Sequence, residues 1–594
     1  MGIPFFFSSL VSRHDLVIPL PASPPDVLAF DYNCLIHTVA QAVARVSQAT
    51  TETQLHRDVF KGIVAYTADI IQAVKPGRVY VAIDGVPPVA KLVQQRKRRY
   101  MAAMERDRKS AGRAGGGGTA AAQLWSSNTV TPGTAFMQKL HTHLGKELPK
   151  LSPGLEFSSW DEPGEGEHKI FRWLAADGEP ARGNNRGEGG SAPHKTVMIY
   201  GMDADMILLS MMHSVHPKRQ ACDVVLLRER QDALVHRADE GQPRGMNIAT
   251  DFDVVSIQRV MAAVLPRLGA RLDSRTAVLN YVLLAALMGN DFLPPLSYLR
   301  IRAAAGSRAK PGMERLMEVA APLLGSGSGA GPGAGTGAAQ SFARWDASDT
   351  TGCHVDFAAL RSLIAELAST EDQRMKEAYG EYLRPPPRRP SPGDSDADHR
   401  WKYLPLMMEE HREVRLVDPS RPGWRMQYNA GLFPRGTDPE SVLREYTAGV
   451  EWVMRYYITN TAPQEEWMFP YCYSPTAQAL HHFLLKNAGK QAVLDSSYRL
   501  PFELTPEVQL LAVTPPGSKA ILSAAQRRVM EDVNHRFMFP DSFRLHTWLK
   551  GVSWECTPQL PPMDLRRLHA ALQRAPAAKK SIKKGSADVT VTAA

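Results

Sequence analysis

Acidic side chains recur in the first half of this sequence where short apolar runs end or where glycine allows a tight turn. Pairs separated by one residue, Glu-Gly-Glu and Asp-Ala-Asp, can point both carboxylates to one side of an extended turn. Carboxylates gathered in this way repel one another unless divalent cations neutralise them, and oxygen ligands suit Mg²⁺ or Mn²⁺. Two such ions can promote in-line hydrolysis of a phosphodiester. The acids that form this pattern are Asp31, Asp84, Glu165, Glu167, Asp203, Asp205 and Asp291.

Any one of these acids has an ordinary structural explanation. An aspartate at the end of a strand is more often the N-cap of the next helix than a metal ligand, and we give Asp161, Asp177 and Asp223 this interpretation outright. The order of the whole set is more specific: two strand-ending aspartates, a Glu-x-Glu pair, an Asp-x-Asp pair and a Gly-Asn-Asp triplet. That order favours a metal-dependent site.

A basic segment follows the second strand-ending aspartate. Residues 89–113 contain nine basic and two acidic side chains, a net charge of +7, and a helical pattern runs over 89–111. On such a helix one face carries Lys91, Gln95, Arg98 and Arg99. Because arginine binds phosphate oxygens through two parallel hydrogen bonds, we expect this face to hold a terminal phosphate beside the acids. An isolated basic helix would instead be a solvated surface or a nuclear-import signal.

Short apolar runs alternate with helical patterns through residues 1–300. The runs at 27–31, 79–84 and 196–200 have the composition of β-strands, and helical patterns lie near 35–48, 54–74, 89–111, 134–148 and 167–175. This alternation predicts βαβ units and a parallel sheet. Ligands of such sheets bind beyond the carboxyl ends of the strands, which is where these runs place acids.

The overall composition is that of an ordinary soluble protein, with 44% hydrophobic and 22% charged residues in 594. No run of 18 apolar residues predicts a membrane span. The first residues lack the features of a signal peptide, and Phe6 stands where a myristoylation site needs Ser or Thr. Five scattered cysteines predict neither a zinc site nor disulfides, which favours a reducing compartment.

The net charge of +9 is segregated along the chain. The basic helix carries +7 and residues 573–594 carry +4, so the remainder has a net charge of −2. A concentrated cationic element therefore stands beside an acidic, metal-requiring centre, an arrangement suited to nucleic acid.

Several of these segments resemble the Xrn-type 5′→3′ exoribonucleases. The matching stretches are residues 1–4, 6–7, 30–37, 82–91, 94–99, 127–134, 163–170, 199–205, 226–229 and 288–294. A weaker second block comprises residues 446–457, 467–475 and 501–503. The resemblance implies an α/β fold with a central, mostly parallel sheet flanked by helices, PIN- or flap-endonuclease-like. An α-rich second conserved region would pack beside it.

The resemblance also implies an activity: processive 5′→3′ hydrolysis of 5′-monophosphorylated single-stranded RNA to nucleoside 5′-monophosphates, with two Mg²⁺ (or Mn²⁺) ions. All seven acids would be catalytic and metal-binding. The implied substrate-binding residues are Lys91, Gln95, Arg98 and Arg99 for the 5′-phosphate, and His37 with Trp467 for stacking on the first bases. Taken alone, His37 is typical of a core or capping histidine and Trp467 of a core aromatic.

Composition and resemblance together predict four segments. Residues 1–304 would form the nuclease core, 305–399 a low-complexity linker with a short helical segment, 400–572 the second conserved region closing the active site, and 573–594 a basic disordered tail. Cys472 departs from the family, which usually has histidine there, and residues 114–118 are glycine-rich where the family is charged and helical. The layout resembles a minimal core without the long auxiliary C-terminal domains.

Other interpretations stay open at this point. A flap-type, structure-specific DNA nuclease shares the acids and the fold, but residues 94–99 and 163–169 fit it poorly. A non-catalytic RNA-binding scaffold would keep the acids only as remnants. We expect a monomeric core with no membrane association and unknown protein partners. The compartment is nuclear or cytoplasmic, and the short layout and basic tail favour the nucleus.

Overall fold

The structure, a computed structural model, describes residues 6–11, 13–112, 124–177, 195–217, 219, 222–230, 248–269, 272–300, 310–324, 340–345, 352–383, 395–403, 416–487 and 500–575. The glycine-rich residues 114–118 and 325–339, the proline-rich residues 384–392 and nearly all of the basic tail lie outside these residues. So does the Met1–Pro4 stretch of the resemblance. No helix in the described part of the chain is both long enough and apolar enough to cross a membrane.

A seven-stranded sheet organises the first half of the chain, in the order β1-β7-β6-β5-β2-β3-β4. Neighbours from β6 to β4 pair in parallel, and β7 and β1 add antiparallel pairings at one edge. The predicted mostly parallel sheet is therefore confirmed. The strands are β1 (Val17–Ile18), β2 (Val27–Asp31), β3 (Arg78–Ala82), β4 (Glu156–Ser158), β5 (Lys195–Tyr200), β6 (Cys222–Glu229) and β7 (Phe252–Ser256).

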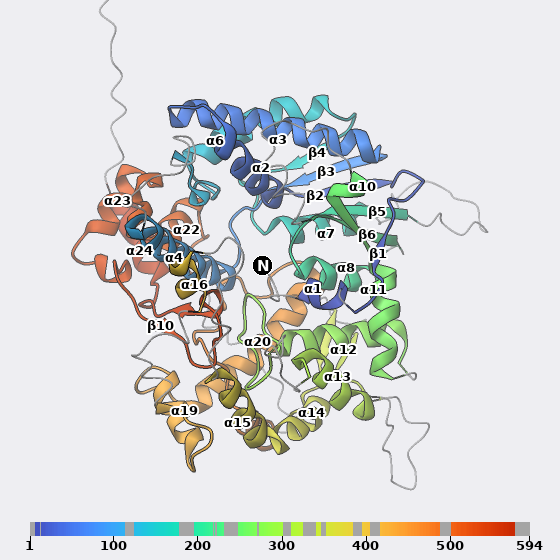
Figure 1. The fold of residues 1–594 in the computed structure, drawn as a ribbon, viewed down its shortest axis with the longest axis vertical. Helices are drawn as coiled ribbons and strands as arrows, with labels where there is room; N and C mark the ends of the chain where they lie inside the picture. The colour runs from blue at the N-terminus through green and yellow to red at the C-terminus, as the bar shows by residue number, and fades with distance from the viewer. Residues whose placement is uncertain are drawn as a thin grey trace, which may run out of the picture.

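Both faces of the sheet are buried because helices cover each of them (Figure 1). On β2, Leu28 and Phe30 belong to the core cluster with α2, α3 and α6, whereas Val27 and Ala29 belong to the cluster with α8 and α12. This alternation follows from the two-residue period of a strand. The helices around the sheet are α1 (Phe6–Val11), α2 (Tyr32–Val46), α3 (Glu52–Val74), α6 (Ala135–Glu147), α7 (Gly166–Asp177), α8 (Asp205–Val215), α10 (Ile248–Asp251), α11 (Ile257–Val264) and α12 (Ser274–Leu287).

Helix α4 (Val89–Gly112) leaves the sheet and packs among elements from the other end of the chain. Figure 1 shows α4, in blue, lying among red helices. Its Val89 and Leu92 share a core cluster with residues of α22 (Pro506–Val513), α23 (Ala524–Glu531) and α24 (Leu565–Arg574). The basic helix therefore joins the two ends of the sequence in one body.

The predicted linker 305–399 contains more helix than expected. It holds α13 (Gly312–Leu323), α14 (Phe357–Ser369), α15 (Glu371–Tyr382) and most of α16 (Asp396–Lys402), with β8 (Ala343–Trp345) paired to β9 (Cys353–Val355). Leu316, Leu363 and Ile364 are fully buried in the main core. These helices have an ordinary composition, but they lie between glycine-rich and proline-rich stretches that made the whole segment look like a linker. The expectation of one short helical segment was therefore wrong.

The second conserved region is mainly helical, as predicted. It comprises α19 (Trp424–Leu432), α20 (Pro439–Thr459), α21 (Ala477–Lys486) and the helices around α4, with a small β10 (Leu545–His546) and β11 (Thr557–Pro558) pair. Trp452 and Tyr446 of α20 are fully buried in the same core as α8 and α12. Helix α20 thus brings the second region directly against the sheet domain (Figure 1).

Candidate active site

The carboxyl ends of β2 and β3 place two predicted acids side by side. Asp31 occupies the N-cap position of α2, but its side chain makes no capping hydrogen bond and accepts one from the Cys34 thiol instead, at 3.1 Å. Asp84 follows β3 by two residues and accepts hydrogen bonds from the Asn33 amide at 2.7 Å and from the Gly166 backbone at 2.6 Å. The ordinary N-cap explanation therefore does not apply to Asp31.

Glycine allows the Glu165–Glu167 loop to approach these aspartates closely. A Cβ atom on Gly166 would lie 3.2 Å from Oδ1 of both Asp31 and Asp84 and 3.0 Å from the backbone oxygen of Ala82. The Glu-Gly-Glu sequence thus has a steric reason, because a larger residue between the two glutamates would crowd both aspartates. Both glutamates are buried, and Glu167 lies in the first turn of α7.

The segment after β5 carries Asp203 and Asp205. Arg228 of β6 binds the backbone of this segment. The Arg228 guanidinium donates to the backbone oxygens of Met202 and, at 3.2 Å, Asp203. It also lies 4.1 Å from the ring centre of Phe7 in α1. Arg228 is buried, so the loop is fixed by a side chain that solvent barely reaches.

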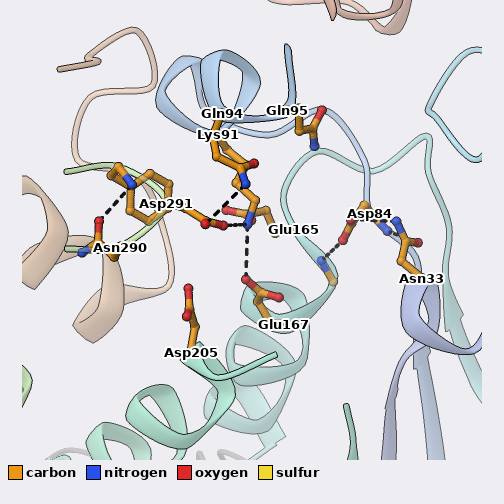
Figure 2. Close-up of polar contacts among 12 residues, drawn as sticks. Asn33, Asp84, Lys91, Gln94, Gln95, Glu165, Glu167, Asp205, Asn290 and Asp291 are labelled. Carbon is orange, nitrogen blue, oxygen red and sulfur yellow. Dashed lines mark hydrogen bonds and ion pairs between the residues drawn. The ribbon is translucent and has the colours of Figure 1, made fainter. Parts of the chain in front are cut away.

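The Gly-Asn-Asp triplet forms a tight turn after α12. Gly289 has a φ of +87°, and a Cβ there would lie 2.7 Å from the nitrogen of Pro295. The Asn290 side chain accepts hydrogen bonds from the backbone of Phe292 and Leu293, each at 2.9 Å. This turn presents Asp291 to the other acids (Figure 2).

The electrostatics confirm that the acids form one cluster. Burial, with Asp84 and Asp203 nearby, raises the pKa of Asp31 to about 8. Burial and Asp291 raise the pKa of Asp205 to about 7. Burial also raises the pKa of Glu167 well above its ordinary value, and Glu165, Asp203 and Asp31 add to that rise. Each of the seven predicted acids therefore lies close enough to another acid of the set to interact with it.

Lys91 of α4 reaches into the middle of this cluster (Figure 2). Its ammonium group pairs with Glu165, lies 3.0 Å from Oδ2 of Asp291 and 3.9 Å from Oε1 of Glu167. Gln94, one turn further along the helix, donates to Asp291 at 3.4 Å. Lys91, one of the four residues of the predicted phosphate-binding face, is thus in direct contact with the acids.

The rest of that face lies beside them. Arg99 is buried and donates to the Thr131 hydroxyl at 2.6 Å, while its Nη1 has no hydrogen-bond partner among the described residues. Gln95 is buried and accepts from Gln509 at 3.3 Å, and Arg98 is exposed. Burial and the charges of Arg98 and Arg99 lower the pKa of His37 to about 4. The imidazole of His37 is therefore neutral at neutral pH and close to both arginines.

Other basic residues of α4 serve the fold. Arg96 donates to the backbone oxygens of Pro561 and Met538, at 2.8 and 2.5 Å. Arg106 donates to Ser518 at 3.3 Å, and Arg108 pairs with Asp398 at 3.0 Å. The helix is therefore divided: its first turns face the acids, whereas Arg96 and Arg106 bind the second region.

The donor set fits a hard divalent cation. Glu165, Glu167 and His168 offer ligand atoms within 4.8 Å of one another, and Oδ1 of buried Asp205 has no hydrogen-bond partner among the described residues. An unsatisfied carboxylate oxygen within a buried cluster of carboxylates favours a bound cation. Mg²⁺ and Mn²⁺ prefer such oxygen ligands.

Comparison with protein families decides where this arrangement belongs. The family model described as XRN 5′-3′ exonuclease N-terminus matches residues 1–230, and the one described as Xrn1 helical domain matches residues 398–580. The chain belongs to the XRN 5′-3′ exonuclease family.

Several relatives of this XRN-family chain align along nearly all of it. It is 23% identical over 617 residues to human 5′-3′ exoribonuclease 1, covering 96% of this chain and 34% of the relative. It is 25% identical over 715 residues to the Caenorhabditis elegans 5′-3′ exoribonuclease 2 homolog, covering 96% of this chain and 71% of the relative. The Saccharomyces cerevisiae 5′-3′ exoribonuclease 1 is 21% identical over 688 residues, covering 96% and 43%. The chain thus spans about a third of the human relative's length.

Trp467 of this XRN-family chain lies in the core and not at an accessible position where it could stack on a base. Trp467 has an exposed fraction of 0% and packs on Trp452, with ring centres 5.1 Å apart. A Cβ on Gly449 would lie 2.7 Å from its ring. No face of Trp467 is free for a base, so the predicted stacking role is not supported by this structure. The alternative of a core aromatic describes it better.

Sequence reasoning missed the contribution of α20 to the site of this XRN-family chain. Tyr456 and Tyr457 donate to Glu165 and Asp205 at 2.8 and 3.2 Å, and Asn460 contacts His168 at 3.1 Å. The tyrosines fall in the block 446–457 that carries the resemblance. A tyrosine in a helix of this composition is typical of a core residue, so nothing in the local pattern signals a contact with the acids.

Proposed function

We propose that this chain is a 5′→3′ exoribonuclease that processively hydrolyses 5′-monophosphorylated single-stranded RNA to nucleoside 5′-monophosphates. Its relatives in human, nematode and yeast are named 5′-3′ exoribonucleases. The observation that carries the proposal is that Lys91, on the cationic helix, contacts Glu165, Glu167 and Asp291, acids from two separate loops. A site that grips a phosphate and a site that can cleave a phosphodiester are therefore contiguous.

The cationic face of α4 supports selection of the 5′-phosphate. Arg99 keeps an unpaired Nη1 within the described residues, although its guanidinium is buried. Burying such a donor without a partner is unfavourable, and a phosphate oxygen would satisfy it. Burial and Arg98 lower the pKa of Arg99 to about 9, so the side chain still carries its charge at neutral pH. Gln95 and the exposed Arg98 add donors on the same face.

The seven acids would hold two Mg²⁺ or Mn²⁺ ions. When bound, these ions supply an activated water and charge stabilisation at the leaving 3′-oxygen. The chain's own part is to supply buried carboxylates such as Asp31 and Asp205 within reach of the other acids. His37, neutral and next to Arg98 and Arg99, would contact the first base by stacking, which tolerates any base.

The test compares RNAs that differ only at the 5′ end, with and without Mg²⁺. We expect rapid release of mononucleotides from 5′-monophosphate RNA and slow digestion of 5′-hydroxyl, 5′-triphosphate and capped RNA. Equal rates on 5′-hydroxyl RNA would contradict the phosphate pocket. Faster cleavage of flap DNA than of single-stranded RNA would instead favour a structure-specific DNA nuclease.

A variant control tests whether the acids perform the reaction. Asp203→Ala/Asp205→Ala should abolish Mg²⁺-dependent RNA loss while leaving the protein folded. RNA loss that persists in this variant would identify a contaminating nuclease and reopen the RNA-binding scaffold.

A further inference from the structure

Two consecutive tyrosines near the end of α20 donate hydrogen bonds to acids of the site. The Tyr456 hydroxyl lies 2.8 Å from Oε1 of Glu165, and the Tyr457 hydroxyl lies 3.2 Å from Oδ2 of Asp205. Each tyrosine is only 2% exposed. Burial and the neighbouring carboxylates raise the pKa of both phenols well above the ordinary value. Because an ionised carboxylate oxygen can only accept a hydrogen bond, each hydroxyl acts as the donor.

Each hydroxyl occupies one oxygen of its carboxylate and leaves the other toward the cluster. The second oxygen of Glu165 faces the ammonium group of Lys91. The second oxygen of Asp205, Oδ1, has no hydrogen-bond partner among the described residues. A carboxylate held through one oxygen has a fixed plane, so the other oxygen is presented in a single direction. This is how groups around a metal orient its ligands.

The tyrosine pair is itself held rigidly against the sheet domain. The His168 ring stacks on Tyr456, with centres 3.8 Å apart, and its Nδ1 lies 3.1 Å from the Asn460 side chain. Arg172 of α7 donates to the Asn460 backbone oxygen at 3.2 Å. The end of α20 is thus tied to α7, the helix that follows Glu165.

We propose that Tyr456 and Tyr457 are positioning residues that orient Glu165 and Asp205 for divalent cation binding. The inference rests on the metal-dependent site of the proposed function and extends it to the second conserved region. In metalloproteins, removing a group that hydrogen-bonds a ligand typically costs about 10- to 100-fold in metal affinity or activity. We expect a loss in that range for each hydroxyl.

The experiment uses the full chain without RNA and measures Mn²⁺ affinity by calorimetry, with thermal unfolding in parallel. Tyr456→Phe, Tyr457→Phe and the double variant remove only the hydroxyls. Tyr446→Phe is the matched control, because Tyr446 lies on the same helix, is fully buried and donates to the backbone oxygen of Pro294 at 3.3 Å. We expect Mn²⁺ binding about 10-fold weaker or worse in the test variants and unchanged in Tyr446→Phe.

A second readout separates positioning from general stability. Nuclease activity of the test variants should recover as the Mg²⁺ concentration rises, with the KM for RNA unchanged. Folded Tyr456→Phe and Tyr457→Phe proteins that bind Mn²⁺ as tightly as the unmodified chain would overturn the inference. If Tyr456→Phe fails to fold, Tyr457→Phe decides it alone.

The Asp205→Ala variant distinguishes failure of this inference from failure of the proposed function. Loss of Mn²⁺ binding in Asp205→Ala, with full binding in both tyrosine variants, would reject the positioning role and keep the metal site. Full Mn²⁺ binding in Asp205→Ala as well would reject the metal site itself.

Discussion

The ammonium group of Lys91 lies 3.0 Å from Oδ2 of Asp291, and the same group pairs with Glu165. The side chain of Lys91 is 10% exposed, so this is a buried cation among buried anions. Against the effect of burial, Glu165, Asp291 and Glu167 raise the pKa of Lys91 well above its ordinary value. Lys91 thus supplies positive charge where the site would otherwise hold only carboxylates.

Replacing Lys91 should make the fold depend on divalent cations. Removing one partner of a buried ion pair costs about 3–5 kcal/mol, and we expect Lys91→Met to lower the unfolding free energy by this amount in EDTA. The loss should shrink in millimolar Mg²⁺, since a ligand that binds only the folded state stabilises it. It should also shrink as the pH falls, because protonation of the acids relieves their repulsion. Denaturant unfolding at pH 5 and pH 8 measures both effects.

Arg98→Met is the matched control for Lys91→Met. Arg98 lies two turns further along α4 but is exposed, so its loss should change stability by less than about 0.5 kcal/mol. An equal loss in the two variants, or a loss in Lys91→Met that Mg²⁺ leaves unchanged, would contradict the role given to Lys91.

Gly85→Ala should displace Asp84 from the site. A Cβ on Gly85 would lie 1.8 Å from the backbone oxygen of Glu162, so the two loops must separate. Their mutual hydrogen bonds, Gly85 to Gly164 at 2.9 Å and Gly164 to Val86 at 2.8 Å, would break. We expect a fall in stability of roughly 2–4 kcal/mol and a larger fall in nuclease activity, measured by thermal unfolding and RNA digestion.

The control for Gly85→Ala is Gly145→Ala in α6. Gly145 has no atom within 4 Å of the added Cβ, so the helix should gain roughly 0.5–1 kcal/mol. Unchanged activity in Gly85→Ala would mean that the Asp84 loop tolerates the separation.

Arg228→Lys should loosen the loop that carries Asp203. The guanidinium contacts the backbone oxygens of both Met202 and Asp203, and a single ammonium cannot match that geometry. We expect activity to fall about 10-fold or more and hydrogen exchange of residues 201–205 to accelerate. Arg259→Lys on the exposed surface should change neither measurement. Native exchange rates in Arg228→Lys would show that the loop is held by other contacts.

Trp467→Phe should weaken the fold without weakening RNA binding. Trp467 is fully buried against Trp452, so the smaller ring leaves a gap that costs roughly 1–3 kcal/mol. RNA affinity, measured in the inactive Asp203→Ala/Asp205→Ala background, should remain unchanged. His37→Ala should give the opposite result, with weaker RNA binding and little change in stability. Weaker RNA binding by Trp467→Phe would restore its predicted stacking role.

Cys472 should be the most reactive of the five cysteines. Burial raises the pKa of its thiol, but Lys97 and a hydrogen bond with His546 outweigh that effect and lower the pKa from 9.0 to about 7. Cys34 is also half-buried, but burial and Asp31 raise its pKa well above the ordinary value. Because the thiolate is the nucleophile, labelling of Cys472 by iodoacetamide should rise with pH around 7. Mass spectrometry identifies the labelled residue.

Lys97→Met provides the control for Cys472. Loss of the ammonium should raise the pKa of the thiol and move the labelling profile to higher pH. Faster labelling of Cys34, or a profile that Lys97→Met leaves in place, would contradict this account.

Local pattern was sufficient to predict the parallel sheet and the set of acids. Strands such as β2 and β5 are buried on both faces and end at one edge, so their periodicity and terminal acids can be identified without knowledge of the other strands. The glycine between Glu165 and Glu167 can also be recognised from the sequence alone. It lets the backbone between the two glutamates lie close to Asp31 and Asp84. Helix α4 was equally predictable, since its charge and period lie within one segment.

The sequence pattern alone could not predict which residues from distant segments meet at the site. Lys91 lies among acids that are up to 200 residues away in sequence, and Trp467 lost its predicted role because Trp452 and Gly449 bury it. Tyr456 and Tyr457 reach Glu165 and Asp205 only because α20 packs against the sheet domain. Helix periodicity defines which side of a segment is buried, but the partner that it meets depends on the packing of the whole chain.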